Sequence, residues 1–215
     1  MFGFRDWNWH QKLTVSVMTP DGLKTGSAVS AVELTKSPRW WGVGDSAGAS
    51  TTGLLGEAVT VDLGHDRFLF VLLDKYSLST ARMAFFPSKR AENRDENNAI
   101  YDRLEALRAT INVPREKYPL FVTFEDIHNP ASVKRVDPDN LEAAFGPGFH
   151  LSAVTIAITD EPVTKGRVEE VLPWLERVGR ERPTLIPNPP RLSTDARDPD
   201  IQYLTPRRFS TELYK

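Results

Sequence analysis

Alternating apolar and polar residues mark two hairpins in the first third of the chain. From Gln11 to Met18 every second residue is apolar, which is the pattern of a strand with one buried face. Thr19-Pro20-Asp21-Gly22 then predicts a turn, because Pro restricts φ and Gly accepts positive φ. A second strand is expected from Lys24 to Leu34. Alternation resumes from Gly56 to Leu63, and the apolar run Phe68–Leu73 completes a second hairpin.

Helical periodicity follows these hairpins. The clearest helix is expected from Ala91 to Thr110, where Ile100, Leu104 and Leu107 recur at helical spacing and charged residues cover the other positions. A shorter helix is expected from Ser79 to Phe86, since Pro87 would stop it. This region therefore supplies helices rather than further hairpins.

The C-terminal half mixes strands with short helices. Strands are expected from Tyr118 to Phe124 and from His150 to Thr159, where β-branched and aromatic residues are frequent. Asp137-Pro138 predicts an N-cap followed by the first helical residue, and Gly146-Pro147-Gly148 would end that helix. Pro173 interrupts a later helical pattern, so it either kinks one helix or begins a second one.

This order of elements predicts an α+β protein. Its sheet is expected to be mainly antiparallel, built from hairpins and packed by two or three helices. Residues 1–179 are expected to form a single α+β domain. Residues 180–215 hold six of the 16 prolines and few apolar residues, which indicates an extended Pro-rich C-terminal arm. The arm would wrap the body, pack on a partner or be partly disordered.

Composition narrows the function classes. The chain has 215 residues, 27 of them basic and 29 acidic, with a net charge of −2 and no cysteine. Disulfides, cysteine metal sites and a catalytic thiol are therefore excluded. The charge balance gives no electrostatic reason to expect nucleic acid as a partner.

The longest apolar run, Phe68–Leu73, is far below the about 20 residues of a membrane-spanning helix. No membrane span is therefore predicted in this chain. The absence of an apolar leader predicts a soluble cytoplasmic protein, or a periplasmic one if a native leader has been removed.

Ser46 is the weak candidate for a catalytic nucleophile. Gly44-Asp45-Ser46-Ala47-Gly48 fits G-x-S-x-G, which exposes a nucleophilic serine when it joins a strand to a helix. Neither a clean strand before it nor a helix after it is predicted here. A flexible loop rich in Gly and Ser is the alternative interpretation.

Asp62, His65 and His128 are weak candidates for metal ligands. Imidazole and carboxylate groups hold zinc or iron, and two histidines with one carboxylate are a known set. Asp62 and His65 lie at the end of one expected strand and His128 follows another, so their spacing alone does not bring the three together. Ordinary turn residues are the alternative. Phosphate-cradling and dinucleotide motifs are absent from the sequence, and no cofactor is predicted.

Tryptophans suggest a binding surface. Trp40 and Trp41 lie in a long loop expected from Ser37 to Gly53, and Trp7 and Trp9 lie near the N-terminus beside Phe2 and Phe4. Aromatic side chains either anchor interfaces or cover the edge of a sheet. Trp40 and Trp41 are the candidate binding residues.

Three stretches of the chain carry a resemblance to other sequences. They are WHQKLTV at residues 9–15, GEAVTVDLG at residues 56–64, and the segment from VDPD at residue 136 to TDEPVT at residue 164. Together they resemble a family of uncharacterised proteobacterial proteins over about residues 9–175. The resemblance implies a bacterial protein. It brings no assigned activity and no catalytic residues.

Two hypotheses of function follow. The first is a non-enzymatic protein-binding or structural module whose partner is another protein or a second copy of the chain. The alternative is a metal-dependent or serine hydrolase that uses Asp62, His65 and His128, or Ser46.

Overall fold

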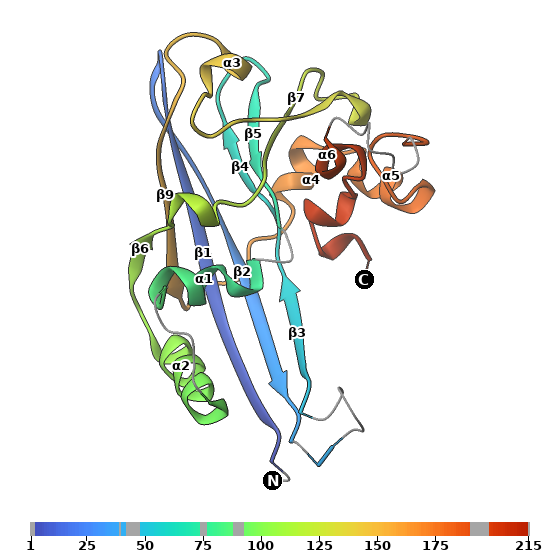
Figure 1. Ribbon diagram of the computed structural model, residues 1–215. Coiled ribbons are helices and arrows are strands. Elements are labelled where there is room, and N and C mark those ends of the chain that lie inside the picture. Colours follow the sequence, from blue (N-terminus) through green and yellow to red (C-terminus); the bar gives the residue numbers. More distant parts are fainter. Residues whose placement is uncertain are drawn as a thin grey trace.

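Two antiparallel sheets and six short α-helices form the part of the chain that the structure describes (Figure 1). The structure is a computed structural model. It describes residues 3–38, 40–41, 48–73, 77–87, 93–189 and 198–214. The predicted α+β class with antiparallel hairpins is confirmed. The described ranges contain six helices where two or three were expected, because the C-terminal third adds several short ones.

The first sheet has five strands. In spatial order they are β3 (Ser50–Leu55), β2 (Gly22–Lys36), β1 (Arg5–Thr19), β9 (His150–Thr159) and β6 (Thr110–Asn112). β1 and β2 form a hairpin of 15 residues per strand, paired from Arg5 opposite Lys36 to Thr19 opposite Gly22. β9 has the predicted bounds.

Two predictions about this sheet need correction. β1 begins six residues before the predicted Gln11, because Trp7 and Trp9 continue the buried positions toward the open end of the hairpin, and β2 extends two residues beyond the predicted 24–34 at each end. β3 lies partly within the predicted loop. Its backbone pairs with β2 at the edge of the sheet. Its first four residues are exposed, so the sequence has no alternation of apolar residues there that would predict a strand.

The second sheet has four strands and is buried on both faces. Its order is β4 (Val59–Asp62), β5 (Phe68–Val71), β7 (Phe121–Phe124) and β8 (Val133–Arg135). Leu69 and Val71 of β5 enter a core shared with the first sheet, whereas Phe70 enters a second core on the opposite face. Burial on both faces explains why the predicted strand at residues 68–73 reads as a continuous apolar run.

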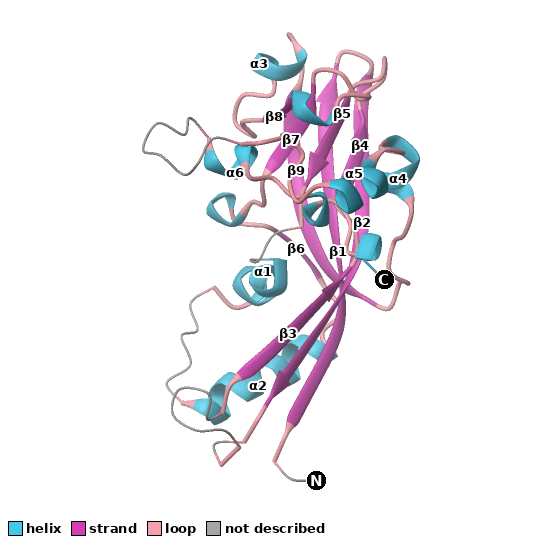
Figure 2. Cartoon of the chain, turned by 90° about the vertical axis from the view of Figure 1, so that its right-hand side faces the viewer, coloured by secondary structure: helices cyan, strands magenta, loops and turns pink. Residues whose placement is uncertain are grey.

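Two helices complete the core between the two sheets, which we call the first core. α1 (Ser77–Phe85) and α2 (Arg94–Ala106) lie against the first sheet (Figure 2). α2 begins at the Asn93 cap, whose side chain accepts a hydrogen bond from the Glu96 amide at 2.9 Å. It ends before the predicted residue 110, because the chain enters strand β6 there.

The C-terminal helices cover the outer face of the second sheet. α4 (Arg167–Val171) and α5 (Leu175–Glu181) flank Pro173, so this proline separates two helices. α6 (Pro199–Gln202) follows. Leu185, Ile201, Leu204 and Phe209 are buried in the second core. Residues 180–189 and 198–214 therefore pack on the body, which was one of the three arrangements expected for the predicted arm (Figure 1).

The predicted N-cap at Asp137 is wrong. α3 (Glu142–Phe145) begins later, and Asp137 instead forms a turn in which its Oδ1 accepts a hydrogen bond from the Asp139 amide at 3.0 Å. Aspartate favours turns and helix caps through the same local hydrogen bonds, so the sequence does not separate them. The described residues also include four 3₁₀ turns: η2 (Arg115–Lys117), η3 (Pro130–Ser132), η4 (Pro206–Arg208) and η5 (Glu212–Tyr214).

We call residues 198–214 the C-terminal segment. Replacing Phe209 tests how much this segment contributes to the stability of the second core. Phe209 is fully buried, with its ring 5.7 Å from that of Phe70. Phe209→Ala should lower the free energy of unfolding by about 3–5 kcal/mol, measured by urea denaturation. Leu23→Ala, at a site 57% exposed, should change it by about 0.5 kcal/mol or less. Equal effects of the two substitutions would show that the segment adds little stability.

The two sheets approach one another closely at Gly26. A Cβ atom at Gly26 would lie 2.2 Å from the carbonyl oxygen of Thr60 in β4. Gly26→Ala should therefore destabilise the protein, although replacing a strand glycine by alanine normally stabilises by about 0.5–1 kcal/mol. Gly53→Ala is the matched control, since its Cβ would meet only Glu33 atoms at 3.6 Å or more. The unfolding temperatures of both variants and the wild type measure this effect. A Gly26→Ala protein more stable than the wild type would contradict this packing.

Candidate functional site

The sequence-predicted catalytic and metal residues do not assemble into a site. Ser46 lies outside the described residues. Asp62 forms a turn, since its Oδ1 accepts a hydrogen bond from the Gly64 amide at 2.8 Å. His65 lies in that turn at φ 56°. The amide of His128 donates to Asp126 in another loop. Among the described residues, no group of three or more His, Asp or Glu side chains is placed to hold a metal ion.

The tryptophans fall into two groups with opposite surroundings. Trp7 and Trp9 are buried, 3% and 4% exposed, and their rings contact Tyr101 of α2. Trp40 and Trp41 are 63% and 56% exposed. The structure therefore separates the residues that the sequence treated together. The first pair belongs to the core, and the second pair remains available for contact with a partner.

Phe4, Trp40 and Trp41 form a cluster that we call the aromatic tip. The Phe4 and Trp41 ring centroids are 5.5 Å apart at 68°, and those of Trp40 and Trp41 are 6.0 Å apart at 80°. Phe4 is 38% exposed. Because adjacent rings are steeply inclined to one another, the cluster presents no shared flat face.

The hairpin register creates the aromatic tip. Pairing of Arg5 with Lys36 brings the residue before β1 close to the residues that follow β2. The chain then turns at Pro38, whose carbonyl accepts a hydrogen bond from the Trp41 amide at 3.0 Å. Gly3 lies against Pro38 at φ +79°, a conformation that favours glycine. The sequence shows three aromatic residues here but not that the long hairpin places them together.

A buried lysine lies at the same end of the hairpin. Lys36 is 7% exposed, and its Nζ lies 5.0 Å from the Tyr101 ring centroid and 5.6 Å from that of Trp7. Nζ donates a hydrogen bond to Asn98 Oδ1 at 3.1 Å. Burial, and then the nearby charge of Arg94, lower the pKa of Lys36. These contacts join the hairpin to α2 and so provide a rigid base for the aromatic tip.

Glu57 is the buried acid that the sequence analysis missed. It is 2% exposed and lines a cavity of about 30 Å³ together with Gln11, Ser30 and Thr80. Its Oε2 accepts a 3.4 Å hydrogen bond from the Val168 amide, while Oε1 has no hydrogen-bond partner within the described chain. Burial raises the pKa of Glu57, and the Val168 hydrogen bond opposes this effect. The only sequence signal for the burial of Glu57 is its position within an apolar stretch, between Gly56 and Ala58.

Comparisons with protein-family models, with curated proteins and with solved structures found no match to this chain. The resemblance to a proteobacterial family over residues 9–175 therefore stays a prediction. Within the described residues, no helix has the length and apolar character needed to cross a bilayer.

The raised pKa of Glu57 predicts how stability depends on pH. The folded state retains the Glu57 proton at pH values where the unfolded state has lost it, so the free energy of unfolding should fall as pH rises from about 4.5 toward neutrality. Glu57→Gln removes this contribution and should be more stable than the wild type at pH 7, but lose that advantage at pH 4. Urea denaturation across this range measures it.

Glu33→Gln is the control for this experiment, because Glu33 is exposed on β2. It should leave the pH profile of stability unchanged. A Glu57→Gln protein whose profile parallels that of the wild type would show that the Glu57 carboxyl does not carry the effect.

Proposed function

We propose that this protein is a non-enzymatic binding module that uses the aromatic tip to anchor a partner protein. The observation that carries the proposal is the exposure of Phe4, Trp40 and Trp41 on a rigid hairpin whose other tryptophans are buried. Clustered exposed aromatic side chains on a soluble domain mark interaction surfaces. Tryptophan is also enriched among the residues that dominate binding energy in protein interfaces.

The shape of the aromatic tip favours a protein partner with a concave apolar pocket. Bases and sugar rings stack best on a flat aromatic face, whereas the Trp40 and Trp41 rings stand at 80° to one another. The net charge of −2 supplies no general attraction for a phosphate backbone. A cluster of exposed rings that point in different directions instead fits a pocket that surrounds it.

The same shape favours a different protein over a second copy of this chain. A two-fold dimer needs a surface that is complementary to itself, and two clusters of steeply inclined rings share no flat face along which to pack. Contact between the aromatic tip and another region of a second copy closes into a two-fold pair only where the reciprocal contact forms at the same time, and otherwise extends into rings or filaments. Self-association is therefore the competing outcome of the test.

The hydrolase alternative receives no support from the described residues. Asp62 and His65 share one turn, and His128 lies in a loop after β7. The three do not form a metal-holding group.

Substitution of the two tryptophans tests the proposal. Trp40→Ala/Trp41→Ala should keep the fold, because both side chains are exposed. It should weaken binding to the partner by about 30-fold or more, as expected when residues that dominate an interface are truncated. Proteins retained from native extract by wild type and variant are compared by quantitative mass spectrometry. The dissociation constant of each purified candidate is then measured by calorimetry.

Met18→Ala/Leu23→Ala is the matched control. It removes exposed apolar surface from the opposite end of the same hairpin, where Met18 and Leu23 are paired, and it should leave binding unchanged. The proposal fails if no retained protein depends on Trp40 and Trp41, or if the control loses the same protein. Polymerisation of the purified wild type, abolished in the tryptophan variant and detected by sedimentation, would replace the partner protein with a second copy.

A further inference from the structure

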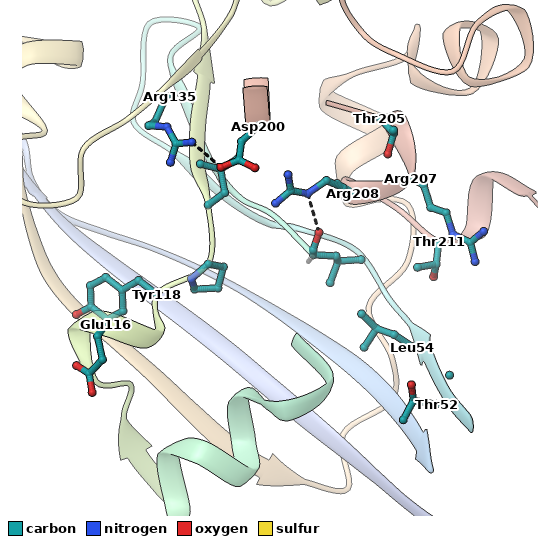
Figure 3. Close-up of a pocket in the computed structure, with 14 residues that line it drawn as sticks. Thr52, Leu54, Glu116, Tyr118, Arg135, Asp200, Thr205, Arg207, Arg208 and Thr211 are labelled. Carbon is teal, nitrogen blue, oxygen red and sulfur yellow. Dashed lines mark hydrogen bonds and ion pairs between the residues drawn. The ribbon is translucent and has the colours of Figure 1, made fainter. Parts of the chain in front are cut away.

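A cleft of about 850 Å³ lies between the first sheet and the C-terminal segment (Figure 3). Five parts of the chain line it: β3, Leu73 after β5, the stretch from Glu116 to Leu120 that leads into β7, Arg135 of β8, and residues between Asp200 and Thr211. The volume falls within the about 300–1,000 Å³ of small-molecule sites. None of the candidate catalytic, metal-ligating or binding residues predicted from the sequence lies in it.

The C-terminal wall of the cleft is held by backbone hydrogen bonds. The Leu73 amide donates to the Arg208 carbonyl at 2.8 Å, and the Thr211 amide donates to the Gly56 carbonyl at 3.0 Å. Phe209, between these bonds, is fully buried in the second core. The position of Arg208 relative to the floor of the cleft is therefore defined before any ligand arrives, which reduces the entropy lost on binding.

Arg135 holds the upper wall and is already neutralised. Its Nε donates to Asp198 at 2.6 Å, and its Nη2 donates to Asp200 at 2.8 Å. These hydrogen bonds raise the pKa of Arg135 and lower the pKa of Asp198. Arg135 thus joins β8 to the start of the C-terminal segment, and its positive charge is matched by two carboxylates.

Arg208 differs from Arg135 in its partners. It is half-buried, and its Nε donates to the Leu73 carbonyl at 3.4 Å. Within the described ranges, no carboxylate lies within ion-pair distance of its guanidinium. Figure 3 shows this group extending from the C-terminal segment toward the middle of the cleft. A guanidinium whose terminal N–H groups face a cleft matches the geometry of a carboxylate or phosphate.

The floor of the cleft is apolar. Leu54, Leu73, Pro119 and Leu120 line it, with Tyr118 at one side. Leu73 and Leu120 are nearly buried at 8% and 9% exposure. Apolar surface beside one oriented cation is the composition of sites that hold a hydrophobic body and fix it by one polar group.

We propose that this cleft binds a small amphipathic anion, with its carboxylate or phosphate group on Arg208 and its hydrocarbon or aromatic body on the Leu54–Leu73–Pro119 floor. This site is separate from the aromatic tip and does not depend on the proposed function. Its ligand is a free small molecule rather than a segment of a protein.

Anilinonaphthalene sulfonate is a suitable probe, because it carries an anionic group on an apolar body and its fluorescence rises on binding. The titration uses the full chain in the Trp40→Ala/Trp41→Ala background, so that binding to the aromatic tip does not contribute. Arg208→Gln should raise the probe's dissociation constant about tenfold or more, as expected for loss of a charged hydrogen bond. Arg177→Gln removes the same charge from an exposed site on α5 and should have no effect.

A second variant tests the same site if the Arg208→Gln protein does not fold. Thr52→Trp fills the cleft from the exposed edge strand β3 and leaves the C-terminal segment intact. It should weaken probe binding as well, with an unchanged unfolding midpoint. Unaltered affinity in both variants would overturn the proposal.

Competition identifies the chemistry of the ligand. Octanoate and octyl phosphate should displace the probe, and the one that acts at lower concentration identifies the preferred headgroup. Octanol, which lacks the charge, and inorganic phosphate, which lacks the apolar body, should displace it at least about tenfold less well. Displacement by octanol as effective as by octanoate would exclude an anion site at Arg208.

Discussion

Burial of the second sheet on both faces is the constraint on which the rest of the structure depends. Its inner face packs against the first sheet, and its outer face carries Phe70, Val122 and Phe124, which water must not reach. The chain covers this outer face with α4, α5 and the C-terminal segment. Because Leu204 and Phe209 complete that layer, residues near the C-terminus are part of the core, and the cleft beside Arg208 exists because they are docked.

The segment between β3 and β4 links the two sheets to this layer. Gly56 lies so close to Ser30 of β2 that a Cβ atom would come within 2.6 Å of the Ser30 hydroxyl. Glu57 bridges to Ser210, and its side chain reaches the first residues of α4. One short stretch therefore contacts the first sheet, the second sheet and the C-terminal segment. A buried carboxyl at such a junction makes the packing of all three sensitive to its protonation.

The two proposed binding surfaces have different structural origins. The aromatic tip depends on the β1–β2 hairpin, whose open end is made rigid by Lys36, Trp7 and α2. The cleft depends on the hydrogen bonds that hold Arg208 and Thr211 against the body. Since the supporting contacts do not overlap, changes at one surface should leave the other intact.

Local patterns in the sequence determined much of the secondary structure. The period of two defined β9 and the cores of β1 and β2, and the apolar run at residues 68–73 identified β5. The three-residue strands β6 and β8 were missed, because so few residues carry no period. Only the tertiary structure decided which tryptophans are exposed, where Glu57 is buried and which arginine faces the cleft. Each of these depends on contacts between residues far apart in the chain, and no local pattern records such contacts.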